Sequence, residues 1–266
     1  TGWFAPLCPS FIFFVFAPSA RASIWWPRQI PKIGILFLIK VLIVLIAYFP
    51  VAAGSPGPLD KKIPFISGPQ WLAENILKDR TVIVITGTHG KTTTSSILTW
   101  ILEDNDYSPG YLIGGVPENF NHSASLGNSE YFIIEADEYD TAFFDKRPKF
   151  LHYRPNITVI NNLEFDHSDI FDNLEQIKKQ FHFLIRSMSA NTNIVYDIND
   201  KNVCSVLDMG CWSKKIVYEK IKTIKNIIGD HNLKNAGAAI SAAETIGINK
   251  DKAMSALENF SGVKRR

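Results

Sequence analysis

Residues 81–94 read TVIVITGTHGKTTT and decide the fold of this chain. The first six residues form a β-branched apolar run, which is typical of a buried strand. Residues 87–91 form a tight loop with two glycines, and residues 92–103 have the pattern of a helix. A strand that enters a helix through a glycine loop predicts an α/β protein with a ligand at this turn.

Strands and helices continue to alternate along the chain after this turn. Helical patterns are found at residues 69–79, 92–103, 174–188, 231–246 and 250–260. Short apolar runs that predict strands are found at residues 81–86, 131–135, 157–161, 194–196 and 215–218. This alternation argues for a mostly parallel sheet flanked by helices on both faces.

The loop at residues 87–91 has the features of a phosphate-binding loop. Its glycines, Gly87 and Gly90, allow backbone N–H groups to turn toward phosphate oxygens, and the helix that follows adds a favourable field. Lys91 is expected to pair with the β- and γ-phosphates, and the Thr92 hydroxyl to bind Mg²⁺. Ile85 stands where the general P-loop pattern has its first glycine, so the loop is a compact variant. The predicted nucleotide-binding segment also includes Thr88, His89 and Thr93.

Carboxylates follow a second predicted strand. Glu135 opens the string EADEYD directly after the apolar run, and Asp137, Glu138 and Asp140 come after it. Carboxylates at the carboxyl end of a parallel strand face the ligand crevice, and Mg²⁺ beside phosphates needs one or two such oxygens. Glu135, the nearest to the strand, is the predicted metal ligand. The other three fit a solvated acidic turn equally well.

Polar groups also follow the strand at residues 157–161, in the string NLEFDH. Asn162 begins this string, and His167 lies beside Asp166 near the same sheet edge. His167 is predicted to ligate a second metal or to orient an acyl-phosphate. A further polar group, His231, Asn232 and Asn235, lies at the start of the Ala-rich helix. These side chains fit contacts with an adenine or a ribose, and they fit helix caps equally well.

Composition and charge exclude several classes of protein. The chain has 266 residues, 46% of them apolar and 20% charged, which fits neither a disordered chain nor a fibre. Its formal net charge of +2 gives no reason to expect a nucleic-acid partner. The three cysteines lack the spacing of a disulfide scaffold or a zinc ribbon, so a reducing compartment fits better.

Residues 1–58 form an atypical apolar segment that differs from the rest of the chain. They contain no acidic residue, and the stretch at 33–49 is almost entirely apolar. As a helix this stretch would be about 25 Å long, slightly short for a bilayer core. One interpretation is a membrane anchor or an uncleaved signal-like segment. The favoured interpretation is a stretch not native to the domain that follows, because the order of regions in a signal peptide is missing.

The strings TGTHGKTTT, EADEYD, NLEFDH, GDHNLKNA and GVKRR, in this order, resemble the central ATP-binding domain of the Mur ligase family. That family forms amide bonds on UDP-linked muramic acid precursors of peptidoglycan. The resemblance covers about residues 63–266, with the central domain at 81–266. Residues 59–80 are then a linker and the tail of an N-terminal UDP-binding domain. The resemblance implies a P-loop NTPase-like α/β fold, a cytoplasmic location, and ATP and Mg²⁺ as cofactors.

The resemblance also implies roles for particular residues. It assigns catalytic roles to Lys91, Asn162 and His167, and metal binding to Thr92, Glu135 and His167. It places His231, Asn232 and Asn235 against the nucleotide. Weaker candidates for the sugar-nucleotide side are Gly114, Gly115 and Asn119.

Within the family, the strings SGPQWLAE, LIGGVPENF and EADEYDTAFFDKRPKFLHYRP are most similar to one subgroup. Its members join the murein tripeptide L-alanyl-γ-D-glutamyl-meso-diaminopimelate to UDP-N-acetylmuramate through an acyl-phosphate, in peptidoglycan recycling. An L-alanine ligase acting on the same UDP sugar is an alternative, and residues 141–155 argue against it. A nucleotide-binding fragment without catalysis and a membrane-anchored NTPase also stay open. The family's third domain would follow GVKRR, so a chain that stops at Arg266 is expected to be inactive by itself.

Overall fold

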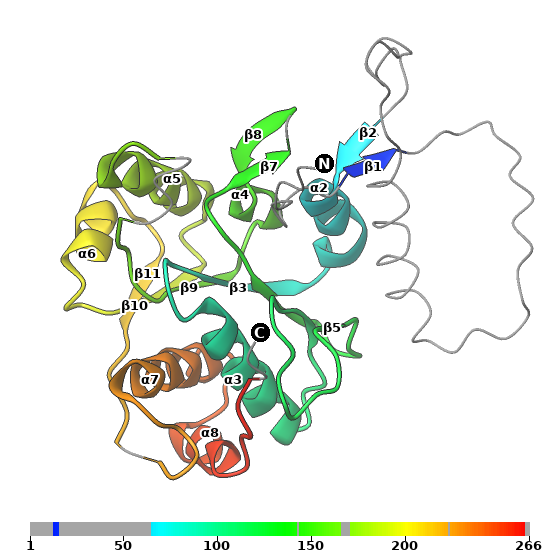
Figure 1. Ribbon diagram of the computed structural model, residues 1–266, viewed down its shortest axis with the longest axis vertical. Coiled ribbons are helices and arrows are strands. Elements are labelled where there is room, and N and C mark those ends of the chain that lie inside the picture. The colour runs from blue at the N-terminus through cyan, green and yellow to red at the C-terminus, as the bar shows by residue number, and fades with distance from the viewer. Residues whose placement is uncertain (1–12, 16–64, 143, 166–170, 223, 264–266) are drawn as a thin grey trace, which may run out of the picture.

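The computed structural model describes residues 13–15, 65–142, 144–165, 171–222 and 224–263 (Figure 1). Its centre is a seven-stranded sheet with the order β11-β10-β9-β3-β6-β4-β5. All neighbouring strands in this sheet are parallel except β4 and β5. The predicted, mostly parallel α/β fold is therefore confirmed.

The strands of this sheet are β3 (Thr81–Thr86), β4 (Gly110–Leu112), β5 (Ala124–Ser125), β6 (Tyr131–Glu135), β9 (Ile157–Ile160), β10 (Asn193–Tyr196) and β11 (Lys214–Val217). The helices are α2 (Gly68–Leu72) with its π-helical continuation η1 (Ala73–Leu77), α3 (Lys91–Asp104), α4 (Phe150–Tyr153), α5 (Leu174–Ser187), α6 (Lys201–Asp208), α7 (Asp230–Glu244) and α8 (Lys250–Leu257). Two small antiparallel pairs lie outside the sheet: β1 (Phe13–Val15) with β2 (Phe65–Ser67), and β7 (Asp140–Ala142) with β8 (Asp145–Pro148).

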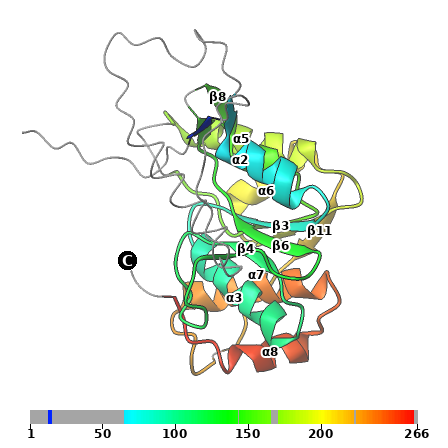
Figure 2. The same ribbon diagram turned by 90° about the vertical axis from the view of Figure 1, so that its right-hand side faces the viewer.

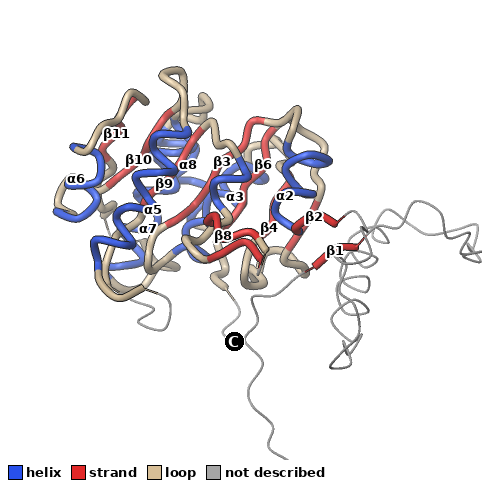
Figure 3. The backbone as a smooth tube through the Cα atoms, turned by 90° about the horizontal axis from the view of Figure 1, so that it is seen from above, coloured by secondary structure: helices blue, strands red, loops and turns tan. Residues whose placement is uncertain are grey.

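The sheet separates two apolar cores, because successive side chains of a strand point to opposite faces. Ile83 and Ile85 of β3 lie in the core that α3, α7 and α8 cover. Val82 and Val84 lie in the other core, which includes Phe181 of α5 and the apolar side of α6. Figure 2 shows these layers, with α2, α5 and α6 on one side of the sheet and α3, α7 and α8 on the other. Figure 3 shows β11 and β10 at one side of the sheet and β6 toward the other.

Most helices begin at a side chain that accepts a backbone N–H, which satisfies one of the free donors of the first turn. Ser67 does this for α2, Asn173 for α5, Asp200 for α6 and Asn249 for α8. The α3 helix is different, because its first residue follows Gly90 and no side chain caps it. Its first backbone donors therefore remain available to a ligand.

Several short elements were not predicted from the sequence. They are β1, β2, β4, β5, α4, α6 and the hairpin of β7 and β8. The hairpin strand β8 reads DKRP and lacks apolar alternation, so nothing in its pattern indicates a strand. The predicted helix at 69–79 is confirmed as α2 with η1, with Pro69 in the first turn as expected.

The apolar stretch at 33–49 lies outside the described residues. Within the part of the chain that the structure describes, no helix combines the length and the apolar character needed to cross a membrane. The anchor-like interpretation of that stretch and its rival stay predictions.

Candidate functional site

Three neighbouring strands, β9, β3 and β6, bring the predicted site residues together at their carboxyl ends. In the register of β3 with β6, Ile85 pairs with Glu135, and in the register of β3 with β9, Thr86 pairs with Ile160. The residues that follow these strands therefore emerge side by side: the glycine loop, the EADEYD segment and the Asn161–Asn162 pair. This is the convergence that the sequence predicts for Glu135 and Asn162. His167 lies outside the described residues.

The glycines of the loop are required by its geometry. Gly87 and Gly90 have φ angles of +121° and +82°, a region that other L-residues avoid. A Cβ at Gly87 would lie 2.8 Å from the backbone oxygen of Asn162. A Cβ at Gly90 would lie 2.4 Å from Oδ1 of Asn235. The loop is thus pressed between the strand end of β9 and the start of α7.

The side chain of Lys91, the first residue of α3, contacts the backbone of this loop. Its Nζ donates hydrogen bonds to the backbone oxygens of Gly87, at 2.6 Å, and Thr88, at 3.1 Å. Within the described residues no carboxylate forms an ion pair with it. An uncompensated ammonium therefore lies beside the uncapped amino end of α3, and both favour a bound anion. This arrangement fits the predicted role of Lys91 toward phosphates.

Thr92 and Glu135 form the predicted cation side of the loop. Oγ1 of Thr92 lies 3.0 Å from Oε1 and 3.0 Å from Oε2 of Glu135. The N–H of Gly114 donates to Oε2 of Glu135 at 2.8 Å, and Gly115 packs near the Thr92 methyl. Hydroxyl and carboxylate oxygens are the ligands that Mg²⁺ prefers, and beside phosphates one or two suffice. In the described part of the chain, no group of three or more His, Cys, Asp or Glu side chains could hold a metal alone.

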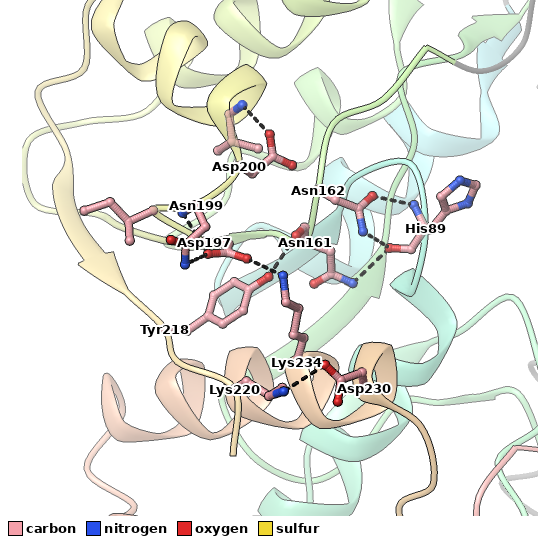
Figure 4. A network of polar contacts seen from close by, with 12 residues as sticks. His89, Asn161, Asn162, Asp197, Asn199, Asp200, Tyr218, Lys220, Asp230 and Lys234 are labelled. Atoms are coloured by element: carbon pink, nitrogen blue, oxygen red, sulfur yellow. Dashed lines mark hydrogen bonds and ion pairs between the residues drawn. The ribbon is translucent and has the colours of Figure 1, made fainter. Parts of the chain in front are cut away.

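Two adjacent amides fix the loop from the end of β9 (Figure 4). Asn162 accepts the N–H of His89 at 2.8 Å and donates to its carbonyl at 3.2 Å. Asn161, which the sequence analysis did not single out, donates to the same carbonyl and to Oγ1 of Thr94. Its own Oδ1 is buried and has no hydrogen-bond partner among the described residues. Because such an atom is costly to leave unpaired, it is a candidate acceptor for a ligand.

A cavity of about 650 Å³ opens beside this loop, between the ends of β9 and β10 and the start of α7. Of the predicted residues, His89, Gly90, Asn162, His231 and Asn235 line it. Asn232 does not line it. Its Nδ2 donates to the carbonyl of Ile228 at 2.8 Å, so this side chain stabilises the start of α7.

An ion pair inside the cavity was missed by the sequence analysis. Lys234 of α7 donates to Oδ2 of Asp197 at 2.9 Å, and the Asp197 side chain is only 8% exposed. Burial raises the pKa of Asp197, but hydrogen bonds from Asn199 and Lys234 outweigh it and hold that pKa below its usual range. Figure 4 shows the Lys234 side chain pointing toward Asp197, with the Tyr218 ring beside them. Asp197 directly follows β10, so the rule that identified Glu135 would have found it.

A second missed group fixes the segment after Asn162. Oδ2 of Asp200 accepts the N–H of Leu163 at 2.9 Å, and Asn202 donates to the carbonyl of Leu163 at 2.8 Å. Oδ1 of Asp200 caps α6. The amino end of α6 therefore holds both backbone groups of Leu163, and through them the position of Asn162.

The remaining predicted residues have other environments. Asp137 pairs with Lys149 at 3.2 Å, Asp140 pairs with Lys146 at 2.7 Å, and Glu138 is buried. A freely solvated position is therefore wrong for Glu138, whereas Asp137 and Asp140 are partly exposed and each pairs with a lysine. Asn119 donates to the carbonyl of Asn259 and accepts the N–H of Ser261, so it holds the last described residues.

The order and geometry of these groups agree with one protein family. Residues 85–218, about half of the chain, match the family described as the Mur ligase middle domain. The chain belongs to the Mur ligase family. The resemblance stated from the motifs alone is thereby confirmed.

Relatives within the family differ in how similar they are to the chain. The UDP-N-acetylmuramate--L-alanyl-gamma-D-glutamyl-meso-2,6-diaminoheptandioate ligase of Escherichia coli (strain K12) is 47% identical over 78% of this chain and 51% of its own length. A UDP-N-acetylmuramate--L-alanine ligase of Buchnera aphidicola is 32% identical over 77% of this chain and 47% of its own length. The chain spans about half the length of these relatives.

A solved structure supports the same placement within the family. The crystal structure of UDP-N-acetylmuramate:L-alanyl-gamma-D-glutamyl-meso-diaminopimelate ligase from Neisseria meningitides is 43% identical. It aligns with a TM-score of 0.74 over 78% of this chain and 74% of that chain. The fold of this Mur ligase chain is thus the fold of that ligase over the aligned part.

Proposed function

We propose that this chain is the ATP-binding part of a ligase that joins the murein tripeptide L-alanyl-γ-D-glutamyl-meso-diaminopimelate to UDP-N-acetylmuramate. The observation that supports it most is the meeting of Lys91, Thr92 and Glu135 at one sheet edge, beside a cavity of about 650 Å³. The groups proposed to bind Mg²⁺, the phosphates and the nucleoside then lie next to one another, as an ATP-dependent reaction requires. The substrates are those in the names of the E. coli and Neisseria ligases described above.

The nucleotide is proposed to lie along the loop. Its base and ribose would occupy the cavity, where Asn161 offers a buried acceptor and Asn235 a side-chain amide. Its phosphates would lie against the glycine loop and the amino end of α3, in reach of Lys91. Mg²⁺, held by Thr92 and Glu135, would neutralise phosphate charge there.

The chemistry consists of two displacements. A carboxylate oxygen of UDP-N-acetylmuramate attacks the γ-phosphorus of ATP, the bond to the ADP oxygen breaks, and an acyl-phosphate forms. The tripeptide amine, after losing a proton, attacks the acyl carbon, and inorganic phosphate leaves as the amide forms. Because charge develops on the phosphoryl oxygens, the protein acts mainly by positioning and charge neutralisation. In this proposal Lys91 supplies the positive charge, while Asn162 maintains the loop. His167, from the string NLEFDH, is proposed as a further metal ligand near the acyl-phosphate.

Tripeptide is favoured over free L-alanine as the amine substrate. The identity to the tripeptide ligase of E. coli is 47%, against 32% for the L-alanine ligase of B. aphidicola. The stretch at 141–155 also argues against an L-alanine ligase.

The proposal is tested by mass spectrometry of the products. The protein, expressed from its full reading frame, is incubated with MgATP, UDP-N-acetylmuramate, and either the tripeptide or L-alanine. The amide product and inorganic phosphate are expected with the tripeptide, with at least about tenfold less product with L-alanine. Lys91→Ala should abolish product, and the matched Lys214→Ala, on the exposed edge strand β11, should not.

Two results would count against the proposal. Faster product formation with L-alanine would favour the rival ligase. ATP binding without phosphate release in the presence of all substrates would favour a nucleotide-binding protein without catalysis.

A further inference from the structure

A second cavity lies near the amino ends of β3 and β9, whereas the phosphate loop follows the carboxyl end of β3. It measures about 560 Å³ and opens between η1, α4 and the hairpin strand β8. It reaches Val82 near the start of β3 and Asn156 just before β9. Contacts join α4 to α2, η1 and β8, and these elements lie together in Figure 1.

One wall of this cavity comes from the sequence stretch that the proposed reaction does not use. Residues 141–155 include β8, α4 and Arg154. In the structure they do not lie at the nucleotide cavity. They build a distinct hollow, which needs its own explanation.

The charge of this cavity is mainly positive. Its lining includes four cationic residues, Lys78, Arg80, Arg147 and Arg154, and one carboxylate, Glu74. Arg80 donates to the carbonyl of Leu126. Neither Lys78 nor Arg154 forms an ion pair with another described residue. His152 is also at the wall, and burial lowers its pKa, so it adds no charge at neutral pH. Lys78 and Arg154, unpaired within the described part of the chain, favour an anion in this hollow together with the two further arginines.

Arg147 is held in place before any ligand arrives. Its Nε and Nη2 donate to the two oxygens of Asp145 at 2.8 and 2.7 Å, and Thr141 donates to its carbonyl at 2.7 Å. Asp145 is itself buried and within 3.0 Å of Nε2 of His152. These bonds leave Nη1 of Arg147 without a partner among the described residues. A donor that is already ordered binds at a lower entropic cost.

From these observations we infer that the second cavity binds a small molecule carrying a phosphate or a carboxylate, with Lys78, Arg147 and Arg154 as its ligands. The volume leaves room for more than the anionic group, and Gln70 and Asn156 supply further polar contacts at the wall. Arginine is suited to either oxyanion because its fork of donors matches both. This inference is independent of the proposed ligase function.

The test reads out the arginines directly. The full chain is labelled with phenylglyoxal, and the modification rate of each arginine is measured by peptide mass spectrometry. Inorganic phosphate and glutarate are titrated separately, with sodium chloride at matched ionic strength as the reference. Arg186, exposed on the last turn of α5, is the control within the same molecule. A phosphate bound at the nucleotide loop does not affect this readout.

We expect either anion to slow the labelling of Arg154, by roughly tenfold at about ten times its dissociation constant, and to leave Arg186 unchanged. Protection by phosphate alone identifies the ligand as a phosphate compound, and protection by glutarate alone identifies a carboxylate. Lys78→Gln should weaken the protection at least about threefold by removing one ligand, whereas Lys214→Gln should not.

A further variant removes a cation from the cavity without disturbing the fold. Arg154 has a φ angle of +45°, which asparagine tolerates well, so Arg154→Asn removes the charge without straining the backbone. Protection of Arg147 should be lost in that variant. The inference is overturned if Arg154 does not react in the free protein, or if it is protected no more than Arg186. It is also overturned if Lys78→Gln and Lys214→Gln behave alike.

Discussion

Oγ1 of Thr92 lies 3.0 Å from each carboxylate oxygen of Glu135. The two residues are 43 positions apart in sequence, and they meet because β3 and β6 are adjacent and end in register. This contact joins the phosphate loop to the acidic segment and defines where a divalent cation would bind between them.

Glu135→Gln should therefore weaken binding of MgATP and leave binding of metal-free ATP almost unchanged. The amide can still accept the N–H of Gly114, which limits structural damage. We expect a loss of about tenfold in MgATP affinity, or ~1.4 kcal/mol, measured by isothermal titration calorimetry with and without Mg²⁺. Glu118→Gln, at an exposed carboxylate, is the matched control. An equal loss with and without Mg²⁺ would exclude a role at the cation.

Asp200→Asn should lower nucleotide affinity through the Leu163 backbone. Asparagine still caps α6, but its amide nitrogen cannot accept the Leu163 N–H that Oδ2 of Asp200 accepts. The segment that orients Asn162 is then held less firmly. We expect ATP affinity to fall about threefold to tenfold, with a drop of ~1 kcal/mol in unfolding free energy. An unchanged affinity would show that this clamp does not position the loop.

Gly90→Ala and Gly247→Ala form a matched pair. Both glycines have positive φ angles, +82° and +93°. A Cβ at Gly247 would meet nothing within 4 Å, whereas one at Gly90 would meet Asn235 and Asn161. Gly247→Ala should cost ~1–2 kcal/mol from backbone strain alone. Gly90→Ala should cost more and should also abolish nucleotide binding. Equal unfolding free energies in denaturant titrations would contradict this packing.

Asp197→Asn should change how stability depends on pH. The folded pKa of Asp197 lies below its unfolded value, so its charge stabilises the protein above about pH 4. That contribution disappears as the pH falls through the folded pKa. The variant should be less stable by about 1 kcal/mol at pH 7, and the difference should shrink as the pH falls below about 4. Thermal unfolding at pH 7 and in acid measures this. Asp140→Asn, in an exposed ion pair, should show little effect at either pH.

The sequence was informative where a single element carries the signal. The run TVIVIT is β3 with the predicted bounds, and Glu135 and Asn162 lie where the end of a parallel strand places them. The hairpin of β7 and β8 gave no such signal, because its charged strand is stabilised by pairs such as Lys146 of β8 with Asp140 of β7. Such pairs are tertiary features that periodicity does not record.

Residues contributed by several distant elements were the hardest to predict. Lys234 reads as one more polar residue on an Ala-rich helix, and only the placement of α7 beside the end of β10 brings it to Asp197. Asp200 could have been found, because an aspartate just before a helix is a typical N-cap. Its contact with Leu163 could not, since it depends on how α6 packs beyond the sheet edge.

The carboxyl ends of β3, β6 and β9 are proposed to bind the triphosphate of ATP through Lys91. Calorimetric titration of MgATP into the wild-type chain, Lys91→Ala and Lys214→Ala tests this, with thermal unfolding as the check on folding. We predict that Lys91→Ala weakens MgATP binding by about 100-fold, or ~3 kcal/mol, while Lys214→Ala binds as the wild type does. A folded Lys91→Ala variant that binds MgATP within about twofold of the wild type would contradict this proposal.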